Sequence, residues 1–343
     1  MFNRICIFGA GAVDGHLAAW LARAGLDVSV VARGPHLDAI RRDGLRYRSD
    51  AEDFTVRVNA SDDARQLGPQ DLVISAVKAH GLGAAVPAML PLLGPDTPVV
   101  FAVNGVPWWY FHGLPAAGDV PPAQRLPRLD PDGALWHRVG VHRAIGCVVT
   151  SPNEIAAPGV IRNNATTNTF VFGEPDDTAS PRLAALAAAL GPALPGLSTT
   201  TAIRDAVWSK ILLNLTTSTL AALTQRPPIQ FAHDEPMLKV YRQLLHEGVR
   251  IAASMGVTVA ADEDARIARM RSVRHPPSLL QDLLAGRPVE IDAQLLAVQD
   301  LARLGGVDTP VLDTLLAVLV QRVQADRPGT SAATPAVSPV GKA

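Results

Sequence analysis

The sequence predicts an α/β protein with a doubly wound parallel sheet in its N-terminal part and an all-helical C-terminal part. Two patterns predict this. Short runs rich in Val and Ile alternate with helical segments through the first third of the chain, which is typical of a parallel sheet covered on both faces. Beyond Thr201 the strand patterns stop, and helical periodicity continues to about Val323. The 343 residues also suffice for about two domains of ~150 residues each.

The N-terminal strands are expected where short β-rich runs are bounded by turn residues or by helical patterns. Strands are expected at Arg4–Phe8, Val28–Ala32, Asp71–Val77, Pro98–Val103, Arg143–Thr150 and Thr169–Gly173, with a further pair inside Leu45–Val58 and a hairpin through Pro158–Gly159. Helices are expected at Ala12–Ala24, which Gly25 would close, at Gly81–Leu93 and at Ser180–Leu190. The Pro-, Gly- and Asp-rich stretch Leu114–Gly133 is expected to be a loop or surface excursion within this part.

The C-terminal part shows helical patterns alone. Helices are expected at Ala202–Leu223, Glu235–Met255, Asp262–Arg271, Ser278–Ala285, Asp292–Leu304 and from Pro310 onward. We therefore expect one domain over residues 1–200 and a second over residues 201–325, meeting at a cleft. Residues 326–343 are rich in Pro, Ser and Ala and are expected to be a disordered tail, because this composition cannot build a core.

Composition excludes several function classes. The chain carries 31 basic and 32 acidic residues and a net charge of −1, so we expect neither nucleic acid nor an anionic membrane surface as a partner. We recognise no export signal and no apolar run near the ~18 residues of a spanning helix, and therefore expect a cytoplasmic protein. Cys6 and Cys147 lie in apolar runs and are expected to be buried free thiols. The histidines show no metal-ligand spacing, so no metal site is expected.

A glycine-rich turn near the N-terminus predicts a Rossmann-type nucleotide site. Gly9 and Gly11 follow a predicted strand and open a helix, as the G-x-G-x-x-G dinucleotide motif requires. Gly9 permits the tight turn, Gly11 lets a pyrophosphate approach the backbone, and the amides of Ala12 and Val13 then face that anion. Asp14 replaces the third glycine. Its side chain either points to solvent in the first helical turn or fills the space that glycine leaves and weakens cofactor binding.

Three polar side chains stand where predicted strands end. Arg33 follows the second strand, where no acid is available for the ribose hydroxyls of NAD, so NADP is favoured; the alternative is an exposed loop arginine. Lys78 and Asn104 follow two further strands. Because ligands of doubly wound sheets bind beyond the carboxyl ends of the strands, we expect both to face the cleft, although a loop lysine is more often a solvated charge.

The most informative helical segment is Trp208–Ser218. Lys210, Asn214 and Ser218 lie at i, i+4 and i+8 among apolar neighbours, so they share one face of the predicted helix. A polar stripe on so apolar a helix is expected to line a cleft, because burying it without partners is costly. The alternative is a stripe that faces solvent on a surface helix.

At this point the chain resembles the ketopantoate reductase (2-dehydropantoate 2-reductase) family. The likeness rests on the order and spacing of short segments over nearly the whole chain: ICIFGAGAV, AVKAH (76–80), NGVPWWYFHG (104–113), VWSKILLNL (207–215), SLLQDLLAGRPVEID (278–292) and GVDTP (306–310). The resemblance implies NADPH-dependent reduction of a 2-oxo acid. The family's central reaction converts 2-dehydropantoate to pantoate on the route to pantothenate.

The resemblance also implies roles for individual residues. Lys210 matches the catalytic lysine that protonates the keto oxygen as hydride arrives, and Glu290 matches an acidic residue that positions lysine and substrate. Asn214 and Ser278 match substrate-binding positions, while Lys78 and Asn104 match positions that contact cofactor and substrate near the nicotinamide. The roles also suit the chemistry, since an anionic 2-oxo acid needs hydrogen-bond donors for its carboxylate and a proton for its ketone.

Three departures from the family pattern qualify these expectations. Asp14 replaces a glycine, Val103 stands where a polar His or Gln is usual, and Ser218 replaces a second substrate-binding asparagine. Two alternatives follow: a relative that reduces another carbonyl or an imine, or a cofactor-binding protein without turnover. The expected partners are a small 2-oxo acid and, as one possibility, a second copy of the chain in a homodimer.

Overall fold

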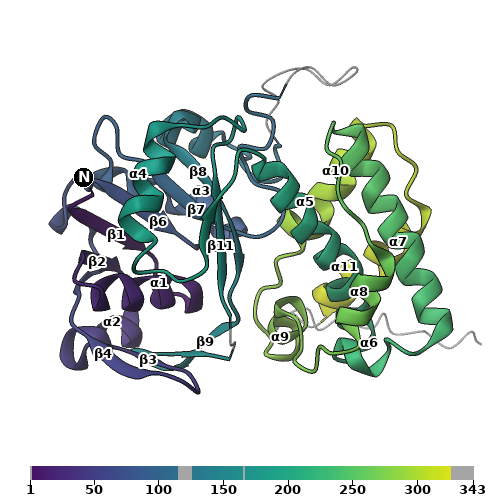
Figure 1. The fold of residues 1–343 in the computed structure, drawn as a ribbon, viewed down its shortest axis with the longest axis horizontal. Coiled ribbons are helices and arrows are strands. Elements are labelled where there is room, and N and C mark those ends of the chain that lie inside the picture. The colour runs from purple at the N-terminus through teal and green to yellow at the C-terminus, as the bar shows by residue number, and fades with distance from the viewer. Residues whose placement is uncertain (1, 115–125, 165–166, 326–343) are drawn as a thin grey trace, which may run out of the picture.

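The computed structural model describes residues 2–114, 126–164 and 167–325. Its N-terminal half is built on an eight-stranded sheet, and helices follow, as the sequence predicts (Figure 1). In spatial order the strands are β12 (Leu197–Thr199), β11 (Thr169–Gly173), β8 (Ala144–Thr150), β7 (Val99–Ala102), β6 (Leu72–Ser75), β1 (Arg4–Phe8), β2 (Asp27–Val31) and β5 (Asn59–Ser61). The chain therefore has the α/β fold class predicted, with a doubly wound N-terminal sheet that is parallel except where β11 runs antiparallel to β8.

The sheet is buried on both faces, which explains the apolar runs of its central strands. β1 pairs in parallel with β2 and β6, and alternate residues of β1 enter two different cores. Ile5 and Ile7 pack with α1 (Ala12–Arg23), α2 (Gly34–Asp43) and α4 (Pro181–Leu190). Cys6 and Phe8 belong to a second core that contains α3 (Ala79–Met89) and the C-terminal helices. That shared core joins the sheet to the helical half.

A second, smaller sheet was not predicted as a unit. The expected hairpin is present as β9 (Asn153–Ala157) and β10 (Val160–Asn163), and β3 (Leu45–Arg48) pairs with β4 (Asp53–Val56) as expected. The sequence did not indicate that β10 also pairs in parallel with β3, which links two hairpins more than 90 residues apart in the chain. This sheet contacts α1, and the ring of His16 on α1 lies 5.3 Å from that of Tyr47 on β3.

The stretch expected as a surface loop is only partly at the surface. Its residues 115–125 lie outside the described residues. Of the remainder, Leu126 and Leu129 are buried, and the Asp130 carboxylate accepts hydrogen bonds from the amides of Leu135 and Trp136. The described part is therefore a loop, as expected, although its apolar residues return it to the core.

The C-terminal half follows the predicted helices closely. They are α5 (Ile203–Leu213), a π-helical turn (Asn214–Ser218), α6 (Thr219–Thr224), α7 (Glu235–Ser254), α8 (Glu263–Met270), α9 (Ser278–Leu284), a second π-helical turn (Asp292–Leu296), α10 (Ala297–Leu304) and α11 (Pro310–Ala325). Figure 1 shows α5 leaving the sheet and entering the helical half. The domain division at residues 200 and 201 stays a prediction, and the tail expected over residues 326–343 lies outside the described residues.

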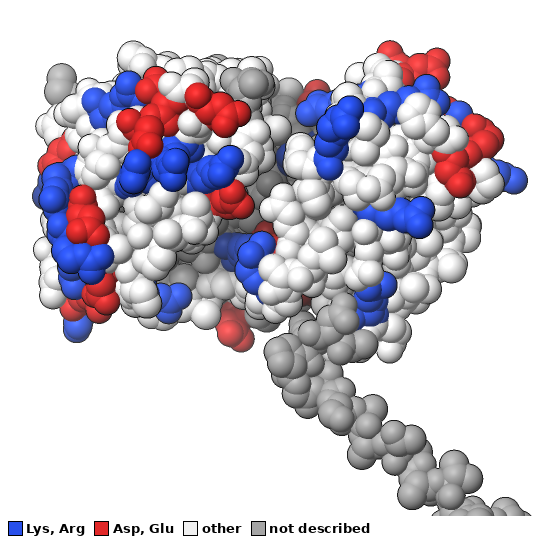
Figure 2. All heavy atoms as spheres, turned by 90° about the horizontal axis from the view of Figure 1, so that it is seen from below, with Lys and Arg blue, Asp and Glu red and all other residues white. Residues whose placement is uncertain are grey.

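Within the described part of the chain, no helix has the length and apolar character needed to cross a lipid bilayer. Figure 2 shows basic and acidic side chains intermixed on the face seen from below, with a hollow between the two halves of the molecule.

Candidate functional site

The glycine turn lies between β1 and α1 and leaves backbone donors available. Gly9 has a φ of +122°, a conformation that side chains rarely adopt, and so a glycine is required there. Gly11 is the N-cap of α1 and supplies no side-chain cap. The first amides of this 12-residue helix, which include those of Ala12 and Val13, therefore lack a side-chain acceptor at the cap. Such a helix start suits a phosphate group, as the motif predicts.

Asp14 is folded back behind this turn. Its side chain is only 2% exposed, and one carboxylate oxygen accepts a 2.7 Å hydrogen bond from the amide of Ala76 after β6. The other oxygen lies 2.7 Å from where a Cβ on Gly9 would stand. Burial raises the pKa of Asp14 to about 7, although hydrogen bonds from the amides of Ala76 and Gly11 oppose the shift. The solvent-pointing alternative is wrong: the carboxyl group fills the space that a glycine would leave.

Arg33 and Asn104 follow strand ends on either side of the turn. Arg33 follows β2, is the N-cap of α2 and has an exposed side chain, so its cation is accessible to a ligand. Asn104 follows β7, and its side-chain oxygen is buried without a hydrogen-bond partner among the described residues. An unpaired buried amide oxygen is costly, and a donor from a bound molecule would satisfy it.

Asn104 is held by a close contact between the two halves. The next residue, Gly105, has a φ of +96°, and a Cβ there would lie 2.5 Å from the carbonyl oxygen of Ala293. The amide of Val106 donates a 2.8 Å hydrogen bond to that same carbonyl. Glycine is therefore required here by conformation and by space, and the contact fixes the end of β7 against the helical half.

Lys78 contacts the helical half directly. It is the N-cap of α3, and its Nζ lies 2.6 Å from a carboxylate oxygen of Asp282 on α9. Asp282 also accepts a 2.8 Å hydrogen bond from Nε of Arg287. The sequence predicted that Lys78 faces the cleft, and its side chain does lie between the two halves.

Lys210 is half-buried on α5. Its Nζ donates a 3.3 Å hydrogen bond to the hydroxyl group of Thr150 at the end of β8. Burial, and to a smaller extent the positive charge of Arg269, lowers the pKa of Lys210 to about 8. An ammonium group with a pKa near neutrality can release and regain a proton under ordinary conditions, which a general acid must do.

The polar stripe continues into the π-helical turn. Asn214 and Ser218 are 5% and 4% exposed, so the solvent-facing alternative is wrong for both. The hydroxyl of Ser218 lies 3.4 Å from the side-chain oxygen of Asn214 and donates to it. The sequence predicted a regular helix here, but the turn is widened. The backbone amide and the hydroxyl of Thr219 both donate to the carbonyl of Asn214, five residues earlier in the chain. Such π-helical turns occur frequently at functional sites.

The structure does not bring Glu290 to Lys210. Glu290 instead accepts a 3.1 Å hydrogen bond from the amide of Ala79 at the start of α3. Burial raises the pKa of Glu290, and the nearby charge of Lys78 partly opposes that shift. Ser278, at the first position of α9, has an exposed side chain. In this conformation the candidate residues thus form a group around Lys78 and Glu290 and another around Lys210 and Asn214.

A small apolar pocket lies near these groups, although none of the candidate polar residues lines it. Its lining is apolar or aromatic with one cysteine, Cys147. Among the lining residues, Val103 directly precedes Asn104, Ala79 directly follows Lys78, and Val207 lies one helical turn before Lys210.

Comparison with known proteins connects this geometry to a family. The family model Ketopantoate reductase PanE/ApbA matches residues 5–108, and its C-terminal counterpart matches residues 202–323. The chain belongs to the ketopantoate reductase family. A 2-dehydropantoate 2-reductase of Mesorhizobium japonicum is 43% identical over 94% of this chain and 98% of that protein.

Solved structures agree with this family membership. The structure of a ketopantoate reductase candidate from Ralstonia solanacearum MolK2 superposes with a TM-score of 0.88 at 37% identity, covering 95% of this chain and 99% of that one. A D-mandelate dehydrogenase solved with NADH and anilino(oxo)acetate has a TM-score of 0.79 at 18% identity over 94% and 99% of the two chains, so it shares the fold.

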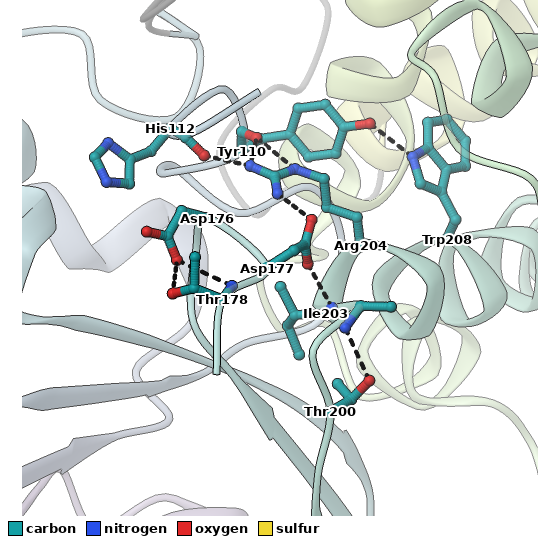
Figure 3. Close-up of polar contacts among 10 residues, drawn as sticks. Tyr110, His112, Asp176, Asp177, Thr178, Thr200, Ile203, Arg204 and Trp208 are labelled. Carbon is teal, nitrogen blue, oxygen red and sulfur yellow. Dashed lines mark hydrogen bonds and ion pairs between the residues drawn. The ribbon is translucent and has the colours of Figure 1, made fainter. Parts of the chain in front are cut away.

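In this member of the ketopantoate reductase family, sequence reasoning missed the residues that anchor α5. Arg204 is buried, forms a 2.5 Å ion pair with Asp177, and donates to the carbonyls of Tyr110 and His112 (Figure 3). One turn later, Nε1 of Trp208 donates a 2.7 Å hydrogen bond to the hydroxyl of Tyr110. These contacts fix the helix that carries Lys210 to the segment that follows Asn104. The signal available in the sequence was the aromatic run at 108–111.

Proposed function

We propose that this protein reduces a 2-oxo acid with NADPH, and that its substrate is 2-dehydropantoate, which it converts to pantoate. Support comes from membership of the ketopantoate reductase family and from the name of the Mesorhizobium japonicum relative. The observation that carries the proposal is Lys210, whose half-buried ammonium group lies between α5 and β8 with a pKa lowered to about 8.

The residues of the glycine turn fit a dinucleotide. The uncapped start of α1 supplies backbone donors for a pyrophosphate through Ala12 and Val13, and Gly11 lets that group approach the backbone. Arg33 offers an exposed cation at the end of β2, where a 2′-phosphate would be recognised, so we propose NADP rather than NAD. The unpaired oxygen of Asn104 offers an acceptor for a donor group on the cofactor or substrate.

In the proposed mechanism NADPH supplies the hydride. Lys210 holds the proton and donates it to the substrate's keto oxygen, so that the developing alkoxide charge forms beside a cation in a partly desolvated place. Asn214 and Ser218 form the polar part of the helix beyond Lys210 and supply hydrogen-bonding groups for the substrate. Ser278 and Lys78 would contribute donors when the two halves enclose the ligands.

We propose a positioning role for Glu290. Its contact with the amide of Ala79 places its carboxylate near Lys78, so in this conformation it orders the start of α3. A contact with Lys210 requires the Glu290 carboxylate to leave the amide of Ala79. We further propose that residues 1–200 form the NADP-binding domain and residues 201–325 the domain that carries Lys210. We expect this enzyme to act in the cytoplasm.

A second candidate function is reduction of a different 2-oxo acid, one with an apolar side chain. Val103 favours it, because this apolar side chain next to Asn104 cannot hydrogen-bond to the hydroxyl group of 2-dehydropantoate, as a polar His or Gln at that position could. A site without a partner for a buried hydroxyl favours substrates that lack it.

The decisive experiment follows NADPH oxidation by its absorbance with 2-dehydropantoate, and with 2-oxo acids whose side chains are purely aliphatic or aromatic. Lys210→Ala is the variant, and Ser209→Ala, at the exposed neighbouring position, is its matched control. Turnover of 2-dehydropantoate that Lys210→Ala loses and Ser209→Ala retains supports the main proposal. Higher kcat/KM for the apolar acids supports the second candidate, and absence of turnover with every acid refutes both.

A further inference from the structure

The carboxyl group of Asp14 occupies a place in the glycine turn that no proposed catalytic step uses. One oxygen is fixed by the amide of Ala76, and the other lies 2.7 Å and 3.1 Å from the Cβ positions that Gly9 and Gly11 would have. Both glycines belong to the backbone against which a pyrophosphate would bind. A titratable group therefore lies directly behind a predicted anion site, buried from solvent.

We propose that Asp14 couples dinucleotide binding to a proton: the protein binds NADPH with the Asp14 carboxyl group protonated, and ionisation of that group weakens binding. This inference rests on the proposed use of a dinucleotide. It concerns the affinity for the cofactor, which can be measured without any substrate.

Among the residues that the structure describes, none supplies a positive charge that lowers the pKa of Asp14. On β1 the facing titratable group is the thiol of Cys6, whose pKa is raised to about 12 by burial, so it is neutral at ordinary pH. On α1 itself, burial lowers the pKa of His16 to about 4, which keeps that ring neutral as well. Beyond Ala76 the nearest cation along the chain is Lys78, and its Nζ is paired with Asp282.

An ionised Asp14 carboxylate and a bound pyrophosphate would repel each other across the glycine turn. Both would also compete for the backbone amides of that turn. The Gly11 amide already interacts with Asp14 and lowers its pKa. Since the pKa of Asp14 is about 7, the group is largely protonated at pH 6 and largely ionised at pH 8.5. A bound pyrophosphate raises that pKa further. Asp14 has one pKa in the free protein and a higher pKa in the complex. At pH values between these two, the affinity for NADPH falls as pH rises, by up to about tenfold per pH unit.

Protonation leaves the local hydrogen bonding largely intact. The oxygen that accepts from Ala76 remains an acceptor in the neutral carboxyl group. Asn at this position keeps that acceptor and the shape of the side chain but cannot ionise, so Asp14→Asn mimics the proposed binding form. Asp14→Gly restores the motif's third glycine and also removes the charge.

The test measures the Kd of NADPH for wild type, Asp14→Asn and Asp14→Gly by calorimetry at about pH 6 and about pH 8.5. The 2′-phosphate of NADPH also titrates in this range, so the informative quantity is the ratio of wild-type to Asp14→Asn Kd at each pH, in which the ligand's own titration cancels. We expect this ratio to rise about tenfold or more between the two pH values. We also expect calorimetry in two buffers of different ionisation enthalpy, near pH 8, to show that wild type takes up more protons on binding than Asp14→Asn does.

A pH-independent ratio, or equal proton uptake by the two proteins, would overturn the inference while leaving the proposed function in place. If Asp14→Asn does not fold, Asp14→Gly replaces it in the test. The ratio of wild-type to Asp14→Gly Kd for NADPH at the two pH values, together with the proton uptake of wild type, then tests the inference. NADPH binding by none of the three proteins at either pH would overturn the proposed function, and this inference with it.

Discussion

Lys78 and Asp282 connect the two halves of the molecule through a 2.6 Å ion pair, although 203 residues separate them in the chain. The Lys78 side chain is 40% exposed and that of Asp282 is 10% exposed. The pair therefore lies at the mouth of the space between the halves, where Lys78 would also reach a bound cofactor. Arg287 contacts the other oxygen of Asp282, so this carboxylate keeps one partner if Lys78 turns away.

A double-mutant cycle with Lys78→Met and Asp282→Asn should give a coupling free energy of about 0.5–1 kcal/mol in unfolding experiments without cofactor, because the pair is only partly shielded from water. The matched control is the fully exposed pair Arg42–Asp43, whose coupling should be near zero. If Lys78 contacts bound NADPH, saturating NADPH should abolish the coupling between Lys78 and Asp282. A coupling that is unchanged by NADPH would show that Lys78 stays on Asp282 in the complex.

The pH dependence of reduction should report Lys210. Its pKa of about 8 lies below the ordinary lysine value because burial disfavours the charged form. A general acid must be protonated, so kcat/KM for oxo-acid reduction should be constant below about pH 7 and fall as pH rises through about 8. Oxidation of the hydroxy acid should show the opposite trend, because it needs the neutral amine. Lys210→Ala should lose about 10²–10⁴-fold in kcat and lose this titration. The same pH profile in Lys210→Ala would assign the titration to another group.

The order of the elements could be predicted because each buried strand and each amphipathic helix carries its own local pattern. The parallel pairing of β10 with β3 could not, because nothing local in either hairpin specifies a partner more than 90 residues away. The same limit applies to the site. Spacing correctly grouped Asn214 with Ser218. Glu290 instead contacts Ala79 and not Lys210, a choice that depends on how the helical half packs against the sheet. Asp14 shows the limit most clearly: an acid at this position is compatible with two orientations, and burial against Ala76 decides between them.

Asp14 should also make the stability of the protein depend on pH. Its pKa is about 7 in the folded chain and 3.8 when unperturbed, so between these values the folded state binds more protons than the unfolded state. The free energy of unfolding of wild type should therefore decrease, relative to Asp14→Asn, as pH rises from about 4 to about 7. The full difference is about 4 kcal/mol. Urea unfolding of both proteins at about pH 4, 5.5, 7 and 8 measures it. A difference between the two proteins that does not change with pH would show that folding leaves the pKa of Asp14 unshifted.

Arg204 should be essential to the placement of Lys210. This guanidinium group is 2% exposed and is compensated by Asp177 and by the carbonyls of Tyr110 and His112. Arg204→Met leaves Asp177 and those carbonyls without their buried partner, and it should lower the free energy of unfolding by about 3–5 kcal/mol.

Asp205→Asn, at the next and exposed position, is the matched control and should change stability by less than about 0.5 kcal/mol. At a temperature where Arg204→Met remains folded, kcat should fall more than the affinity for NADPH, because the contacts of Arg204 fix α5 and not the glycine turn. Equal loss of kcat and of NADPH affinity would instead indicate a general loosening of the fold, and would refute a specific role for the Arg204–Tyr110 contact in positioning Lys210.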